Sequence, residues 1–171
     1  MNGEQYIRHA YQAILRHDFE QAVGWFEQAI SLEPDNASYH YKLSITYARS
    51  GKLAKGLEHA QRAVRLEPDR ELYRYHVQHL QAKELAQQAE KLFAQLPPEA
   101  SLGVALLQEA VRLDPLAIEA YLLLALGYDL LQQYLEALQA INELLKLDPE
   151  HEIAHNYHQE LKEKLKRYLQ T

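Results

Sequence analysis

Apolar residues recur along the chain at three- and four-residue steps, in stretches that are paired across short polar turns. In the first pair, residues 5–15 and 19–32 flank the turn 16–18. The second stretch contains Phe19, Ala22, Val23, Phe26, Ala29 and Ile30 at this spacing. Such spacing places side chains on one stripe of a helix. The pattern therefore predicts two antiparallel helices joined by a tight turn.

The second stretch of each pair ends on a similar phrase, Leu-Glu-Pro or Leu-Asp-Pro. These phrases end at Pro34, Pro68, Pro115 and Pro149, so the prolines are spaced 34, 47 and 34 residues apart. Proline cannot donate a backbone N–H and disfavours helical backbone in the residue before it, so each helix should stop there. A period of one helix pair is typical of a stacked repeat array, whose surface usually serves binding.

Within the units, small and aromatic residues recur at fixed positions. The first unit has Tyr6, Ala10, Ala22, Phe26 and Ala29; the second has Leu43, Ser44, Tyr47, Gly56 and Ala63; the last has Tyr121, Leu124, Ala125, Tyr128, Tyr134 and Ala137. This pattern resembles the tetratricopeptide repeat, which also places proline at position 32. The departures are mild: Ala13 and Ala60 stand where aromatics are expected, and Leu144 stands where alanine is expected.

The resemblance implies an all-α fold, a right-handed α-solenoid of antiparallel helix pairs in a single domain of residues 1–171. The repeats are expected at about 3–36, 37–70, 71–117 and 118–151. A capping helix over residues 150–169 should cover the last repeat, because a solenoid end otherwise exposes its apolar stripe. Its inner face is expected to carry Ile153, Tyr157, Leu161 and Tyr168.

The 47-residue unit is an elongated third repeat. No Gly or Pro occurs between Leu72 and Leu96, yet the apolar stripe changes sides. One face carries Tyr73, Val77 and Leu80, and nearly the opposite face carries Ala82, Leu85, Ala89, Leu92, Phe93 and Leu96. Either one helix is buried on both sides, or it breaks near residues 80–83. We expect one long helix, because residues 81–84 are good helix formers. Such a long helix would widen the groove or provide a docking edge; the alternative is an insertion with no role.

Composition excludes several classes of protein. A formal net charge of -6 argues against a nucleic-acid binder, and the basic cluster Lys162, Lys164, Lys166 and Arg167 is interleaved with acids, as on a solvated face. The chain has no cysteine, so it has no disulfide and no thiolate metal site. It shows neither a secretory signal nor an apolar run long enough to span a bilayer. We therefore expect a cytoplasmic protein without nucleic-acid or membrane partners.

One motif with possible chemistry lies in the expected capping helix. His151-Glu-Ile-Ala-His155 matches H-E-x-x-H, in which two histidines one turn apart bind zinc and the Glu activates water. Catalytic zinc needs a third protein ligand, and the remaining residues lie on the same helix. His158 is seven residues from His151, too far along the helix axis to complete the site. A zinc metallohydrolase is thus a remote alternative, and His151 and His155 are more suited to adventitious metal binding.

In the tetratricopeptide family the first helices of successive repeats line a concave groove. The resemblance assigns to this groove Arg8, Tyr11, Tyr41, Lys42, Ile45, Arg49, Leu122, Leu123, Leu126 and Asp129. The carboxylate clamp of one family subtype is absent, because its positions hold Ile7, Tyr11, Lys42, Leu85 and Ala89.

The resulting hypothesis is a non-catalytic scaffold or adaptor without cofactors, which binds a peptide or helix of a protein partner. The groove should favour a segment with an apolar anchor and an acidic flank. Self-association into a homo-oligomer through the aliphatic end of the groove is the alternative.

Overall fold

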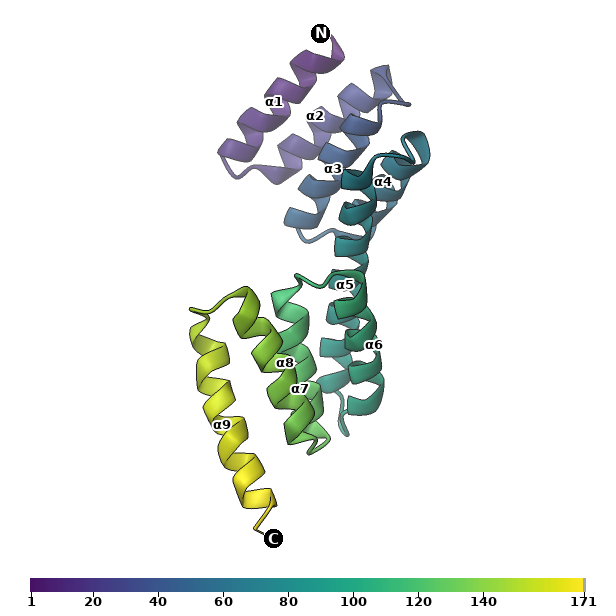
Figure 1. Cartoon of the computed structure of the whole chain (residues 1–171). Helices are drawn as coiled ribbons and strands as arrows, with labels where there is room; N and C mark the ends of the chain where they lie inside the picture. Colours follow the sequence, from purple (N-terminus) through teal and green to yellow (C-terminus); the bar gives the residue numbers. More distant parts are fainter. Residues whose placement is uncertain (171) are drawn as a thin grey trace. The chain divides into compact units, whose positions relative to one another are not determined.

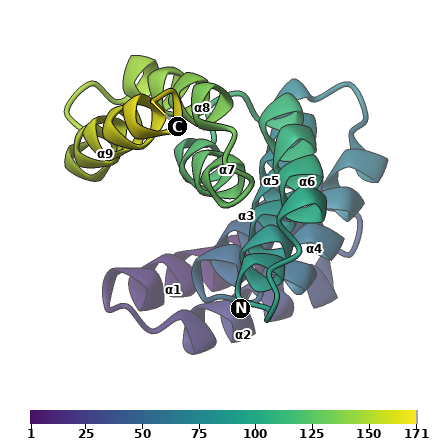
Figure 2. The same cartoon turned by 90° about the horizontal axis from the view of Figure 1, so that it is seen from below.

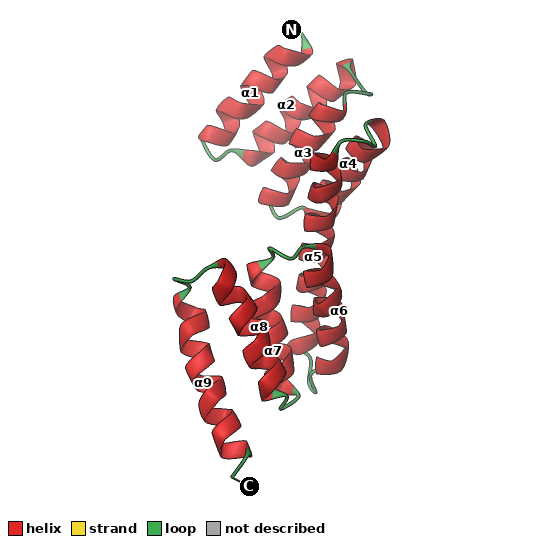
Figure 3. Ribbon diagram, viewed as in Figure 1, coloured by secondary structure: helices red, strands yellow, loops and turns green. Residues whose placement is uncertain are grey.

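The computed structural model describes residues 1–170, in which nine α-helices are joined by short loops (Figures 1 and 3). The helices are α1 (Gly3–Leu15), α2 (Phe19–Leu32), α3 (Ala37–Arg49), α4 (Leu53–Leu66), α5 (Glu71–Phe93), α6 (Ala100–Leu113), α7 (Ile118–Leu130), α8 (Tyr134–Leu147) and α9 (Glu152–Tyr168). Consecutive helices pack as pairs, so the predicted all-α fold of helix pairs is confirmed.

The chain divides into two compact units, and the boundary lies within α5. Unit 1 is Met1–Leu80 and unit 2 is Gln81–Thr171. Residues 71–93 nevertheless form one helix, as the absence of Gly and Pro predicts, although it ends three residues before Leu96. The division into a single domain of four repeats stays a prediction.

The change of sides in the apolar stripe of α5 coincides with this boundary. Tyr73 and Leu80 are buried in unit 1, where they pack with residues of α3 and α4. Ala82, Ala86 and Ala89 are buried in unit 2, in the core that includes α6 and α7. The two stripes therefore belong to two different cores, and α5 contributes buried side chains to each.

The core of unit 1 consists of the predicted stripes. Its largest fully buried side chain is that of Phe26, which packs in a cluster with Ile7, Leu43 and Tyr47. Buried alanines at the recurrent small positions let neighbouring helices approach closely. The core of unit 2 is built in the same way around Leu107, Ile141 and Leu144.

The last helix of the described chain packs against α8, as Figures 1 and 2 both show. Leu161 and Ala154 are fully buried on its inner side, whereas Ile153, predicted on the inner face, is 63% exposed. The helix begins at Glu152 rather than at residue 150, because His151 is its N-cap and accepts a hydrogen bond from the Ala154 N–H. It follows that α9 covers the last helix pair, as a capping helix should.

The carbonyl of the helix-ending proline is satisfied by the same device at three of the four junctions. The side chain six residues later donates to it: His40 Nε2 lies 2.9 Å from the Pro34 oxygen, and His155 Nε2 lies 2.7 Å from that of Pro149. Arg74 donates in the same way to the Pro68 oxygen at 2.8 Å. Each of these bonds satisfies a carbonyl of the turn that joins two successive helix pairs.

The turns within the pairs α1–α2, α3–α4 and α7–α8 share one backbone feature. Their middle residues, His17, Gly51 and Gln132, have φ values of 59°, 79° and 58°. Only glycine adopts this left-handed region without steric cost. The tight turn thus depends on one residue with positive φ in each pair.

Two glycines should respond in opposite ways to substitution by alanine. Gly51→Ala should lower the free energy of unfolding by about 1–2 kcal/mol, because a side chain is strained at positive φ. Gly24→Ala should raise it by about 0.5–1 kcal/mol, since Gly24 is in the exposed interior of α2 with no atom within 4 Å of an added Cβ. Urea unfolding of the two variants measures both effects. Equal signs would contradict the conformations assigned to these glycines.

Candidate functional site

The predicted groove residues are divided between the two units. The α1–α3 surface of unit 1 is defined by Arg8 and Tyr11 of α1 and by Tyr41, Lys42, Ile45 and Arg49 of α3. The other four, Leu122, Leu123, Leu126 and Asp129, all lie on α7 in unit 2.

Aromatic rings connect the α1–α3 surface to the first turns of α5. The ring of Tyr41 lies 5.0 Å from that of Tyr73 and 5.1 Å from that of His76. Tyr11 is 46% exposed and its ring meets Phe26 edge-on. Burial raises the pKa of Tyr11, with further contributions from the charges of Glu4 and Tyr41. Tyr11 is thus an exposed ring on α1, and Tyr41 is a partly exposed ring on α3.

The cations of the α1–α3 surface are not neutralised. Arg8, Lys42 and Arg49 have no acidic partner within residues 1–170. The Arg49 guanidinium lies 5.4 Å from the centre of the Phe19 ring, and Lys42 Nζ donates to Ser38 Oγ at 3.0 Å. Elsewhere in unit 1 the basic side chains of Lys52 and Arg62 are paired with carboxylates. This surface therefore offers positive charge that is available to a ligand.

Formal charge is unevenly distributed between the units. Residues 1–80 contain ten Lys or Arg and ten Asp or Glu, whereas residues 81–171 contain eight and fourteen. The net charge of -6 thus lies entirely in unit 2. Unit 1 is neutral as a whole, and the three cations of the α1–α3 surface that lack acidic partners give this surface positive charge.

A Ser–His contact lies below this surface. Ser44 Oγ is 2.8 Å from His76 Nε2. Burial lowers the pKa of His76 to about 4, with a smaller contribution from His79, so its ring is neutral at pH 7. Ser44 is fully buried and no substrate can reach its hydroxyl group. The pair therefore positions His76 under Tyr41 and does not form a nucleophile–base site.

Sequence reasoning did not assign Tyr73 and His76 to the surface. A signal was present, because the spacing of Tyr73 after Pro68 repeats that of Tyr39 after Pro34. Both tyrosines are 3% exposed in the structure. The repeat phase alone therefore places the start of α5 beside α3.

On α7, the predicted residues have different roles. Leu122 and Leu123 are half-buried against the core of unit 2, and Leu126 is 38% exposed. Asp129 is engaged by α9: its Oδ2 accepts from the Tyr157 hydroxyl at 2.8 Å and from Lys164 Nζ at 2.6 Å. Of these residues, Leu126 is the one most available to a partner.

The contacts of Asp129 shift the pKa values of its partners. Burial raises the pKa of Tyr157, and the hydrogen bond to Asp129 raises it further. Bonds to Asp129 and to Glu160, whose Oε1 is 2.8 Å from Nζ, raise the pKa of Lys164. Both groups keep their protons at pH 7, so Asp129 fixes α9 in place through two charged or polar contacts.

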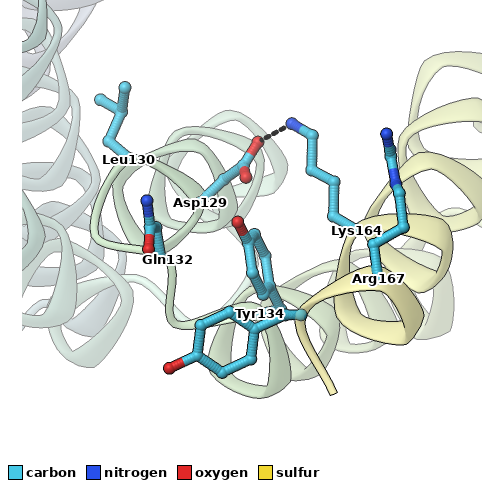
Figure 4. Close-up of a pocket in the computed structure, with 7 residues that line it drawn as sticks. Asp129, Leu130, Gln132, Tyr134, Lys164 and Arg167 are labelled. Atoms are coloured by element: carbon cyan, nitrogen blue, oxygen red, sulfur yellow. Dashed lines mark hydrogen bonds and ion pairs between the residues drawn. The ribbon is translucent and has the colours of Figure 1, made fainter. Parts of the chain in front are cut away.

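An open cavity of about 650 Å³ lies beside this cluster (Figure 4). Its lining residues are Asp129, Leu130, Gln132, Tyr134, Lys164, Arg167 and Tyr168. Lys164 and Arg167 come from α9, Leu130 is the last residue of α7, and Gln132 lies in the following turn. The Tyr134 and Tyr168 rings meet edge to face at 5.6 Å. The charge of Lys164 is already shared by Asp129 and Glu160, whereas among the described residues Arg167 bonds only to the backbone carbonyl of Glu163.

The two histidines of the H-E-x-x-H match make hydrogen bonds at the start of α9. His151 Nδ1 accepts from the Ala154 N–H at 3.2 Å, and His155 Nε2 donates to the Pro149 carbonyl. In the part of the chain that the structure describes, no three His, Cys, Asp or Glu side chains are grouped as metal ligands would be. Helix capping accounts for the placement of both rings.

Two family models match the chain. A model described as "TPR repeat" matches residues 16–51, and one described as "Tetratricopeptide repeat" matches residues 118–151, the bounds expected for the last repeat. None of the curated proteins compared with the chain matches it. The chain is a tetratricopeptide-repeat protein, as the recurrence of its packing positions predicts.

Several solved structures share this arrangement of helices. MamA (residues 41 to the end) from Desulfovibrio magneticus RS-1 is 18% identical, with a TM-score of 0.58 over 98% of this chain and 93% of the other. MamA AMB-1 is 20% identical, with a TM-score of 0.58 over 98% and 85%. A tetratricopeptide repeat protein from Parabacteroides merdae ATCC 43184 is 20% identical, with a TM-score of 0.60 over 97% and 61%. Identities this low show a shared fold alone.

Members of the tetratricopeptide family are generally protein–protein interaction modules and typically have no catalytic activity. No helix formed by residues 1–170 combines the length and hydropathy needed to cross a bilayer.

Proposed function

We propose that this protein is a non-catalytic scaffold that binds a segment of a protein partner on the α1–α3 surface of unit 1. The observation that carries the proposal is the combination of two exposed or partly exposed tyrosines, Tyr11 and Tyr41, with three cations that lack acidic partners. Tyrosine and arginine are the side chains that most often anchor interfaces. The family, whose members generally bind proteins, supports the same class of function.

The chemistry of the surface favours an acidic segment with an aromatic or aliphatic anchor. The anchor would pack against Tyr11 and Tyr41, and flanking carboxylates would pair with Arg8, Lys42 or Arg49. Either an amphipathic helix or an extended peptide can present these groups. In unit 2, Leu126 is proposed as a separate apolar contact. Asp129 is proposed to stabilise α9 and not to contact the partner, because Tyr157 and Lys164 already occupy it.

Tyr41→Ala should lower the affinity for the captured partner tenfold or more, since loss of a tyrosine anchor typically costs more than 1 kcal/mol. Leu126→Asp should also lower this affinity, because it places a charge at the apolar contact proposed on α7. The partner is first captured from native lysate with the wild-type chain and identified by mass spectrometry, and its affinity for each variant is then titrated.

Leu147→Asp on α8 is the matched control for Leu126→Asp, because both leucines are 38% exposed and Leu147 lies on a second helix. It should leave the affinity unchanged. Unchanged affinity in Tyr41→Ala would show that the α1–α3 surface is wrongly assigned, and unchanged affinity in Leu126→Asp would show that Leu126 does not contact the partner.

The alternative is a self-associating module, in which Leu126 and the neighbouring aliphatic residues of α7 contact a second copy. Its specific support is the exposure of Leu126. Sedimentation velocity at several concentrations tests it, because the sedimentation coefficient would rise with concentration only if copies associate. The cytoplasmic location and the absence of an enzymatic activity stay predictions.

A further inference from the structure

Two histidine rings face each other between α3 and α4. His40 of α3 is 7% exposed, and its Nδ1 lies 2.9 Å from Nδ1 of His59 on α4. The two rings stack with centroids 5.2 Å apart, and Tyr47 stacks on the other side of His59 at 5.6 Å. The other nitrogen of His40, Nε2, lies 2.9 Å from the Pro34 carbonyl oxygen. Both nitrogens of His40 are therefore fixed by partners.

These partners determine which nitrogens carry protons. The Pro34 carbonyl can only accept, so His40 Nε2 must carry its proton and donate. In neutral His40 the Nδ1 atom is then an acceptor, and His59 must donate to it from Nδ1. His59 Nε2 remains without a proton in the neutral pair. One arrangement of protons thus satisfies all three groups.

The pair can accept one proton but not two while this contact holds. A first proton on His59 Nε2 leaves the Nδ1–H donor of His59 pointing at His40. A second proton would have to enter His40 Nδ1, which would place two N–H groups and two positive charges face to face at 2.9 Å. Such a contact is repulsive and has no acceptor. Double protonation therefore requires the contact between the His40 and His59 rings to break.

We propose that the His40–His59 pair is an acid-sensitive contact that stabilises the α3–α4 hairpin only while the pair holds at most one proton. Acidification would destabilise this hairpin, an inference that rests on the geometry of the pair alone. It would thereby weaken partner binding by Tyr41 and Lys42, an inference that rests on the proposed function of the α1–α3 surface.

The groups around His59 shift its pKa in both directions. Burial lowers the pKa of His59, the neighbouring His40 lowers it further, and Lys55 contributes in the same sense. Glu58 and Glu27 oppose these effects. The net direction is downward, so the folded chain binds fewer protons than the unfolded chain, whose histidines titrate near 6.5. Stability from the pair is fully present above about pH 6.5 and is lost as the pH falls below that value.

Urea unfolding of the whole chain at pH 7.5, 6.5 and 5.5 tests the proposal. The single tryptophan, Trp25, lies in α2, so its emission reports on unit 1. The decisive variant is His59→Gln, whose amide can donate to His40 Nδ1 when His40 is neutral and accept from it when His40 is charged. As the pH falls below 6.5, the equilibrium constant for unfolding should rise more steeply in the wild type than in the variant. The difference between the two should be up to about tenfold for each pH unit.

The control is His17→Asn, which removes an exposed histidine at positive φ, where asparagine is tolerated. It should keep the pH dependence of the wild type. The buried His76 is present in all three proteins, so its contribution cancels from the comparison. A His59→Gln variant that is as sensitive to acid as the wild type would overturn the proposal.

Nitrogen NMR of the wild-type imidazoles gives a test that needs no variant. At pH 7.5 the proton of His40 should be on Nε2 and that of His59 on Nδ1, and the reverse assignment in either ring would overturn the proposal. Titration of partner binding separates the two steps. If the unfolding result is as expected but the affinity at pH 5.5 stays unchanged, the pair is correctly assigned and the α1–α3 surface is not the binding site.

Discussion

Phe26→Ala is expected to lower the free energy of unfolding of unit 1 by about 3–5 kcal/mol. Phe26 is fully buried in the core of this unit, where it packs with Ile7, Leu43 and Tyr47. Truncation removes apolar contacts from all of these residues and leaves a cavity that helices α1–α3 can fill only in part. Urea unfolding followed by circular dichroism measures the loss, because the neighbouring Trp25 makes fluorescence unsuitable for this variant.

Leu32→Ala is the control for this prediction. Leu32 lies on the same helix as Phe26 but is 53% exposed, so its truncation should change stability by no more than about 0.5 kcal/mol. Similar losses in the two variants would mean that the apolar stripe of α2 does not face the core.

Gln81→Pro is expected to lower the free energy of unfolding by about 3 kcal/mol or more. Gln81 lies within α5, immediately after the boundary between the two units. Proline there removes the N–H that bonds the carbonyl four residues earlier, and its ring collides with that carbonyl. Both effects arise only if the helix is continuous through residues 80–83. Urea unfolding followed by circular dichroism gives the change.

Gln81→Ala separates the backbone effect from the loss of the half-buried amide side chain. Alanine is the best helix former and should leave stability nearly unchanged. A proline variant as stable as the alanine variant would show that residues 80–83 form a break, the alternative that the sequence leaves open.

Much of the fold follows from local sequence signals. Leu-Glu/Asp-Pro phrases end α2, α4, α6 and α8 within two residues of each proline, since proline terminates a helix whatever surrounds it. The continuity of α5 follows equally from the absence of Gly and Pro. The start of α9 was misplaced by two residues because His151 is a less common N-cap than the Asp and Asn residues at Asp18 and Asn36.

The candidate site was only partly predictable. The repeat phase located Tyr41 and Lys42 on a first helix, but exposure and pairing depend on neighbours far along the chain. Asp129 is bound by residues 28 and 35 positions away, a contact that no local pattern encodes. The same holds for His40 and His59, which meet across a separation of 19 residues. Distance in sequence, and not the kind of residue, limited the prediction.

Dissection of the protein into fragments is constrained by α5. A cut at the boundary between Leu80 and Gln81 would sever a helix of 23 residues next to the buried Leu80. Fragments that retain their cores must therefore overlap, one ending at or after Phe93 and the other beginning at or before Glu71. In evolutionary terms, neither half could be exchanged or lost at that boundary without a replacement for the shared helix.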